Sequence, residues 1–208
     1  MGLRRQLHAA VLGGVATLAG MAGLSRQAEA AFIVTLEEVG SDVVLMGSGT
    51  LNTTALTADG TSTQAPGLTP PIGFLGIGAP TFQQVDSYSD INGPASFGSG
   101  GGSGASSGSG DIVALSGFFS VIAVPHGYVS GAALSDTSTF TGKTLANLGV
   151  TPGTYVWTWG SGDNADSFTL HIISPDVAVP EPASALLLGL PITGMMVARR
   201  WGKQSDAA

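Results

Sequence analysis

Short apolar, β-branched and aromatic stretches recur through the middle of the chain, separated by clusters of Gly, Ser, Asp and Pro. No stretch between residues 31 and 176 has a helical period, and regular short spacing of this kind is typical of a sandwich or barrel. The pattern predicts one all-β domain, an antiparallel β-sandwich of Greek-key or jelly-roll type. The predicted strands are 32–37, 42–46, 72–77, 81–88, 112–115, 118–124, 137–141, 154–159 and 167–173.

The clearest alternation lies in the last two predicted strands, where large apolar side chains occupy every second position. Because side chains alternate between the two faces of a strand, each set shares one face, and we expect the two strands to pair. The two sets are Tyr155, Trp157 and Trp159, and Phe168, Leu170 and Ile172. Residues 148–155 also resemble the tyrosine corner of Greek-key sandwiches, in which the tyrosine hydroxyl bonds back to an earlier backbone group.

Turn residues punctuate the domain in two places. Val39, Gly40 and Ser41 part the first two predicted strands and suit a tight hairpin. Residues 98–110 contain only Gly, Ser and one Ala, a composition typical of flexible segments. The stretches on either side are small for independent cores without disulfides, so we expect a long loop inside one domain.

The N-terminus has the pattern of a secretory signal peptide. Arg4 and Arg5 precede an apolar run over residues 9–24, and Ala28 and Ala30 form an A-x-A cleavage pattern. A helix over that run would reach only ~24 Å, short of a ~30 Å hydrocarbon core. We therefore predict a signal peptide over residues 1–30, cut by signal peptidase before residue 31.

A second apolar run, residues 183–198, ends the chain and stops at the basic cluster Arg199, Arg200 and Lys203. Cations are retained on the cytoplasmic side of a membrane, so both basic ends belong inside and the domain between them outside. Gly189, Pro191 and Gly194 interrupt the run, and proline removes a helical hydrogen bond. The sequence predicts a transmembrane helix that holds the protein in a membrane only temporarily.

We expect the segment before that run to be extended and accessible, because two prolines flank one glutamate. It consists of Val179, Pro180, Glu181, Pro182, Ala183 and Ser184. With the apolar run and the basic cluster, residues 177–208 resemble the PEP-CTERM sorting signal of Gram-negative bacteria. The tail is sometimes catalogued as an ice-binding protein C-terminal segment, a name that implies no ice binding. The tyrosine-corner segment also recurs ahead of the tail in an uncharacterised type of PEP-CTERM protein.

The resemblance implies a processing route and a setting. An exosortase, a cysteine transpeptidase-like enzyme of the inner membrane, would process the tail, after which the protein is released or transferred to the cell surface. Such proteins are usual in bacteria that make exopolysaccharide and biofilm, so exopolysaccharide is an expected partner.

Composition excludes several other classes of protein. The chain has no Cys, which removes disulfide scaffolds, zinc ribbons and thiol nucleophiles. Its net charge is −7, and the central region from 31 to 178 has one basic side chain, Lys143, against eleven acids, a charge of −10. Nucleic-acid binding is excluded, because it depends on cations that neutralise phosphates.

Two groups of residues could bind a ligand. Asp163, Asn164 and Asp166 lie between the last two strands and could hold Ca²⁺, although a solvated turn explains them as well. Tyr155, Trp157 and Trp159 could stack on sugar rings if exposed, but as core residues they also fit a sandwich without disulfides. We expect no other cofactor.

Catalytic patterns are weak. The glycine tract lacks a phosphate-loop ending, and no Gly-x-Ser-x-Gly elbow precedes a helix. His126 and His171 show no zinc-ligand spacing. The sequence thus favours a non-enzymatic structural or adhesive protein of the cell surface or exopolysaccharide, with a carbohydrate- or calcium-binding module as alternative and a secreted hydrolase as a weaker one.

Overall fold

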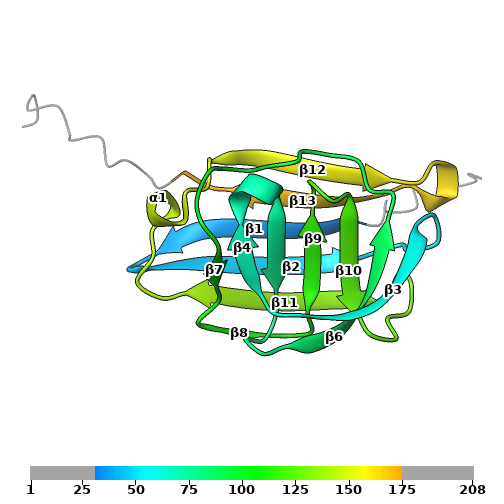
Figure 1. The fold of residues 1–208 in the computed structure, drawn as a ribbon, viewed down its shortest axis with the longest axis horizontal. Helices are drawn as coiled ribbons and strands as arrows, with labels where there is room; N and C mark the ends of the chain where they lie inside the picture. The colour runs from blue at the N-terminus through cyan, green and yellow to red at the C-terminus, as the bar shows by residue number, and fades with distance from the viewer. Residues whose placement is uncertain (1–30, 175–208) are drawn as a thin grey trace, which may run out of the picture.

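A computed structural model describes residues 31–174, which form two β-sheets facing each other with very little helix. The strands of the seven-stranded sheet run across those of the six-stranded sheet (Figure 1). This all-β, sandwich-like architecture confirms the coarse prediction. The signal peptide, the sorting motif, the apolar run 183–198 and the basic cluster lie outside the described residues.

The six-stranded sheet has the strand order β12-β13-β1-β2-β11-β8. Its strands are β1 (Ala31–Val39), β2 (Asp42–Thr50), β8 (Ser107–Ser109), β11 (Ala133–Phe140), β12 (Gly153–Trp159) and β13 (Asp166–Ile172). A single helical turn, α1 (Leu145–Leu148), and a 3₁₀ turn, η2 (Gly162–Asn164), lie in its connections.

The seven-stranded sheet has the strand order β3-β6-β10-β9-β5-β4-β7. Its strands are β3 (Thr57–Gln64), β4 (Gly67–Thr69), β5 (Phe74–Ile77), β6 (Gln83–Ser89), β7 (Ser103–Gly104), β9 (Val113–Ser116) and β10 (Val121–Pro125). The 3₁₀ turn η1 (Pro70–Ile72) joins β4 to β5.

One cluster of buried apolar side chains fills the space between the sheets. The alternating pattern of β1 supplies Phe32, Val34 and Leu36, all without exposed surface. Trp157 on β12 packs edge-on against Phe168 of β13, with ring centroids 6.0 Å apart. The period-two pattern of the sequence thus determines which side chains of these strands face the core.

Three local predictions are confirmed. β1 and β2 form a hairpin through Gly40, whose φ of 64° is the left-handed conformation that glycine adopts freely. β12 pairs with β13, Trp157 lying opposite Phe168. The Tyr155 hydroxyl donates to the Thr151 carbonyl at 2.9 Å, which is the hydrogen bond expected of a tyrosine corner.

One strand pair departs from the antiparallel prediction. β1, the first strand, lies parallel to β13, the last, from Ala31 opposite Ser167 to Leu36 opposite Ile172. Within each of the two sheets, the other pairs of neighbouring strands are antiparallel. The first and last strands are thus neighbours in the middle of the six-stranded sheet.

The prediction of a flexible loop at residues 98–110 is wrong, because this stretch, hereafter the Gly/Ser segment, is bonded to both sheets. Its strand β7 adds to β4 at the edge of one sheet, and its strand β8 adds to β11 at the edge of the other. Ser106 N–H also donates to the Thr139 carbonyl at 2.7 Å. Glycine allows this close approach: a Cβ on Gly100 would overlap the Leu148 carbonyl, and one on Gly108 the Gly78 and Thr137 carbonyls.

Candidate functional site

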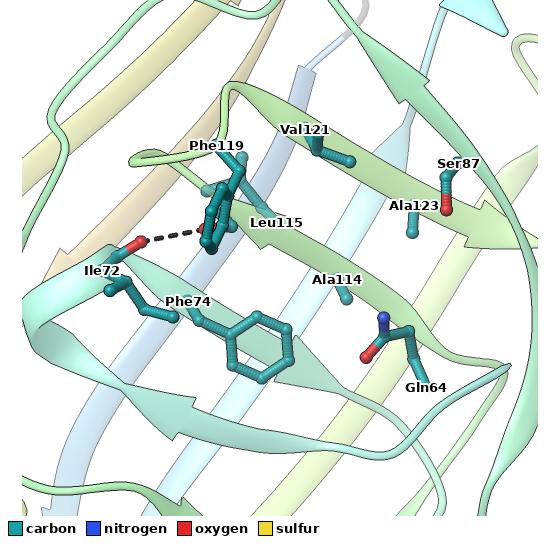
Figure 2. Close-up of a pocket in the computed structure, with 10 residues that line it drawn as sticks. Gln64, Ile72, Phe74, Ser87, Ala114, Leu115, Phe119, Val121 and Ala123 are labelled. Atoms are coloured by element: carbon teal, nitrogen blue, oxygen red, sulfur yellow. Dashed lines mark hydrogen bonds between the residues drawn. The ribbon is translucent and has the colours of Figure 1, made fainter. Parts of the chain in front are cut away.

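The outer face of the seven-stranded sheet is hollowed into a trough of about 390 Å³. Its floor is made by small side chains of β9 and β10, among them Ala114 and Ala123 (Figure 2). The strands alternate, so the neighbouring positions Leu115 and Ile122 are buried, in the core between the sheets. The residues that line the trough are Gln64, Ile72, Phe74, Ser87, Ala114, Leu115, Ser116, Phe119, Val121 and Ala123.

Two phenyl rings from different elements flank the floor. Phe74 begins β5, and Phe119 lies in the turn between β9 and β10, where 61% of its surface is exposed (Figure 2). The backbone holds this turn in place, because Gly117 N–H donates to the Gly73 carbonyl and Phe118 N–H to the Ile72 carbonyl, each at 3.2 Å.

Polar groups of the trough are few and uncharged. Gln64 and Ser87 lie at the end away from Phe119 (Figure 2). Ser116 donates its hydroxyl hydrogen to the Ile72 carbonyl at 2.9 Å. An apolar hollow with a few polar groups is the usual form of a small-ligand site, and its volume falls within the ~300–1,000 Å³ typical of such sites. The lining contains no acid, base or histidine.

The aromatic stripe predicted as a possible sugar platform is in the core. Trp157 has no exposed surface and Trp159 only 5%. Their indole N–H groups donate to the carbonyls of Pro94 and Asn52 at 2.9 and 2.7 Å. Tyr155 is half-buried and forms the tyrosine corner. Sugar stacking on this stripe is therefore excluded, and the alternative of core packing is correct.

The predicted calcium loop also folds differently from a cation site. Asp163 and Asn164 are exposed in η2, whereas Asp166 is buried in β13. The Asp166 carboxylate accepts hydrogen bonds from the backbone N–H groups of Asn52, at 2.5 Å, and Ser167, at 2.6 Å. Burial raises the Asp166 pKa to about 6, and these two bonds oppose that rise. Its role is to join the loop after β2 to β13.

The two histidines of the domain lie apart. His171 on β13 is within 3.0 Å of the Thr154 hydroxyl. His126 lies 2.8 Å from the Asp86 carboxylate, which also accepts the Gly127 N–H. The hydrogen bond to His126 is the main cause that lowers the Asp86 pKa to about 2. Within residues 31–174, no three His, Cys, Asp or Glu side chains gather as a metal site would require.

Asp136 is the unusual acid of the domain. It lies on β11 and faces inward, with 2% of its surface exposed, and its Oδ2 has no hydrogen-bond partner in the described part of the chain. Burial, followed by the negative charge of Asp111, raises the pKa of Asp136 to about 7. The neighbouring inward position, Ser138, is fully buried but bonds both the N–H and the carbonyl of Gly78.

The chain matches no protein-family model, and neither a curated protein nor a solved structure is significantly similar to it. Within residues 31–174, no helix is both long and apolar enough to cross a membrane.

Sequence reasoning missed both the trough and Asp136. The sequence predicts a strand over residues 118–124, whereas β10 begins only at Val121 and Phe119 lies in the turn before it. For Asp136 a signal exists: Leu134, Asp136, Ser138 and Phe140 alternate in phase, so the apolar ends of this series place the acid on the core side.

Proposed function

We propose that the protein is an exported, non-enzymatic protein of the cell surface or extracellular matrix, and that its β-domain holds uncharged polysaccharide in the trough. The observation that carries this proposal is an uncharged hollow flanked by phenyl rings on a domain of charge −10. The proposal keeps the adhesive role expected from the sequence and moves the binding surface to the opposite sheet.

Sugar chemistry fits this lining. A pyranose ring has apolar C–H faces, which pack on aromatic rings, and hydroxyl groups at its rim, which need polar partners. Phe74 and Phe119 supply the first kind of contact, and Gln64 and Ser87 the second. A polysaccharide rich in carboxylates would be repelled by the acidic domain, so the ligand class is a neutral glycan.

The contacts of His126 support a non-enzymatic role. A nucleophile would need to be within hydrogen-bond reach of the His126 ring, yet the Thr61 hydroxyl donates to Asp86 instead, at 3.0 Å. The trough lacks the paired carboxylates that hydrolyse glycosidic bonds, so it would hold a glycan without cleaving it.

The tail supplies the route to the surface. We propose that signal peptidase recognises Ala28 and Ala30 and cuts before Ala31, that residues 177–208 act as a PEP-CTERM signal, and that exosortase acts at the Pro180–Pro182 region. The inner membrane would hold the protein until that step.

The first test concerns sugar binding. Replacing Phe119 by alanine removes one phenyl wall, and we expect the dissociation constant for a soluble neutral glucan to rise roughly tenfold, which corresponds to about 1.4 kcal/mol. Phe82→Ala is the matched control, because Phe82 is 81% exposed and does not line the trough. Isothermal titration calorimetry with the glucan and with a polyuronate measures both variants. Equal weakening by the two substitutions, or preference for the polyuronate, would contradict the proposal.

The second test concerns sorting. Replacing Pro180, Glu181 and Pro182 together by alanine should leave unprocessed precursor in the inner-membrane fraction as the main species, because the extended recognition segment is lost. Immunoblotting of membrane and extracellular fractions measures this. Ser184→Ala, a nearby substitution that keeps both prolines and the glutamate, is the control and should have a smaller effect. Normal release of the triple variant would refute the sorting role and leave the sugar-binding proposal untouched.

A further inference from the structure

Asp136 lies directly beneath the point where the Gly/Ser segment leaves the six-stranded sheet. Ser109, at the end of β8, pairs with Thr137, and their hydroxyl oxygens are 2.9 Å apart. The next residue, Gly110, has a φ of 88° and lies so close to β11 that a Cβ there would overlap the Asp136 carboxylate. The backbone at Gly110 therefore covers Asp136.

The elements around Asp136 offer it little compensation. On β2 its neighbour is Gly47, which has no polar side chain. In the connection after β5, the backbone of Gly78 is already bonded to Ser138. Asp111 acts on Asp136 in two opposite ways: its negative charge raises the pKa of Asp136, and a weaker effect, the hydrogen bond from its backbone N–H, lowers it. An ionised Asp136 would therefore be a buried anion with an unpartnered oxygen, next to a second anion, and such a state is costly.

We propose that Asp136 makes the attachment of the Gly/Ser segment depend on pH: the segment is held while Asp136 is protonated and detaches from β11 when Asp136 ionises. Detachment admits water to the carboxylate, at the expense of the short β8–β11 ladder. That ladder has only three residue pairs, the least extensive of the six-stranded sheet. We therefore expect ionisation to open the connection after β8.

The direction of the effect follows from proton linkage. A solvated Asp136 ionises near 3.8, whereas the buried one keeps its proton to about 7. Below pH 3.8 both states are protonated and pH has no effect. Between 3.8 and 7 the open state releases its proton first, so each rise in pH favours opening, and above 7 the effect is complete. From pH 5.5 to 8.5 this difference predicts a rise of about 30-fold in the opening equilibrium.

Amide hydrogen exchange on the full-length protein tests this proposal, provided that the rates are corrected for the intrinsic effect of pH. Amides of residues 106–111 should exchange faster than those of the β1–β2 hairpin, and their opening should increase about 30-fold between pH 5.5 and 8.5. Asp136→Asn, which cannot ionise, should abolish the pH dependence of this segment. Protection in residues 106–111 equal to that of the hairpin, or unchanged by pH, would overturn the proposal.

A second variant serves if Asp136→Asn does not fold. Asp111→Asn removes the neighbouring charge from an exposed position and leaves Asp136 in place. Its pH dependence should persist with a midpoint moved to lower pH, because one cause of the raised pKa is gone. A midpoint identical to that of the wild type would contradict the role given to the two acids.

Discussion

Trp157→Ala should lower the free energy of unfolding by about 3–5 kcal/mol, the usual cost of truncating a buried tryptophan. Among residues 31–174, Trp157 is the largest side chain without exposed surface. Its loss would leave a cavity beside Phe168 and remove the hydrogen bond to the Pro94 carbonyl. Urea denaturation measures the change, and a drop in melting temperature of roughly 10 °C should accompany it.

Val156→Ala is the matched control for this experiment. Val156 is the preceding residue on β12, but its side chain points outward and is 41% exposed. Its replacement should change the stability by about 0.5 kcal/mol or less. If the two variants lost stability equally, Trp157 would not be part of the core, and the surface-exposed aromatic stripe would have to be reconsidered.

Gly100→Ala should destabilise the domain by about 3 kcal/mol, at the upper end of ordinary overpacking. The new methyl group would overlap the Leu148 carbonyl and lie 2.8 Å from Gly149 Cα. Both neighbours are backbone atoms and cannot rotate away. Thermal unfolding of the variant measures the loss of stability.

The next residue provides the control. A Cβ on Gly101 meets nothing within 4 Å, so Gly101→Ala should leave the stability nearly unchanged. If the segment were a free loop, the two substitutions would have the same small effect on stability. Equal behaviour of the variants would therefore show that the Gly/Ser segment is not packed against the domain.

The parts of the fold that could be predicted from the sequence are those in which the apolar or polar character of each side chain indicates whether it is buried. Phe32, Val34 and Leu36 take every second position of β1, and Trp157 and Trp159 do so on β12, so their strands and shared faces follow from period two. The tyrosine corner was predictable because one local hydrogen bond defines it.

Strands β3, β7 and β8, which the sequence did not predict, are held by backbone pairing and by hydrogen bonds of polar side chains instead of by apolar packing. β3 contains Thr, Ala, Asp, Gly, Ser and Gln, and its side chains are mostly exposed at a sheet edge. β7 and β8 consist of Ser and Gly. Such residues leave no hydrophobic pattern, and their composition is shared with flexible linkers, so the pairing partner decides their structure.

The trough could not be predicted for a different reason. Phe74 and Phe119 lie far apart in the sequence, and their approach depends on the register of β5, β9 and β10 and on the turn at Gly117. Register is a property of strand pairs, so one strand's pattern does not reveal it. The prediction of a sorting signal in the tail has a different basis: it depends only on the order of the motif, the apolar run and the basic cluster along the sequence.

The parallel pairing of β1 with β13 has a mechanical consequence. Because these strands run the same way, the chain enters the six-stranded sheet at one end and leaves it at the other (Figure 1). Tension between the two ends would load all six residue pairs of this ladder in shear, instead of peeling them apart singly.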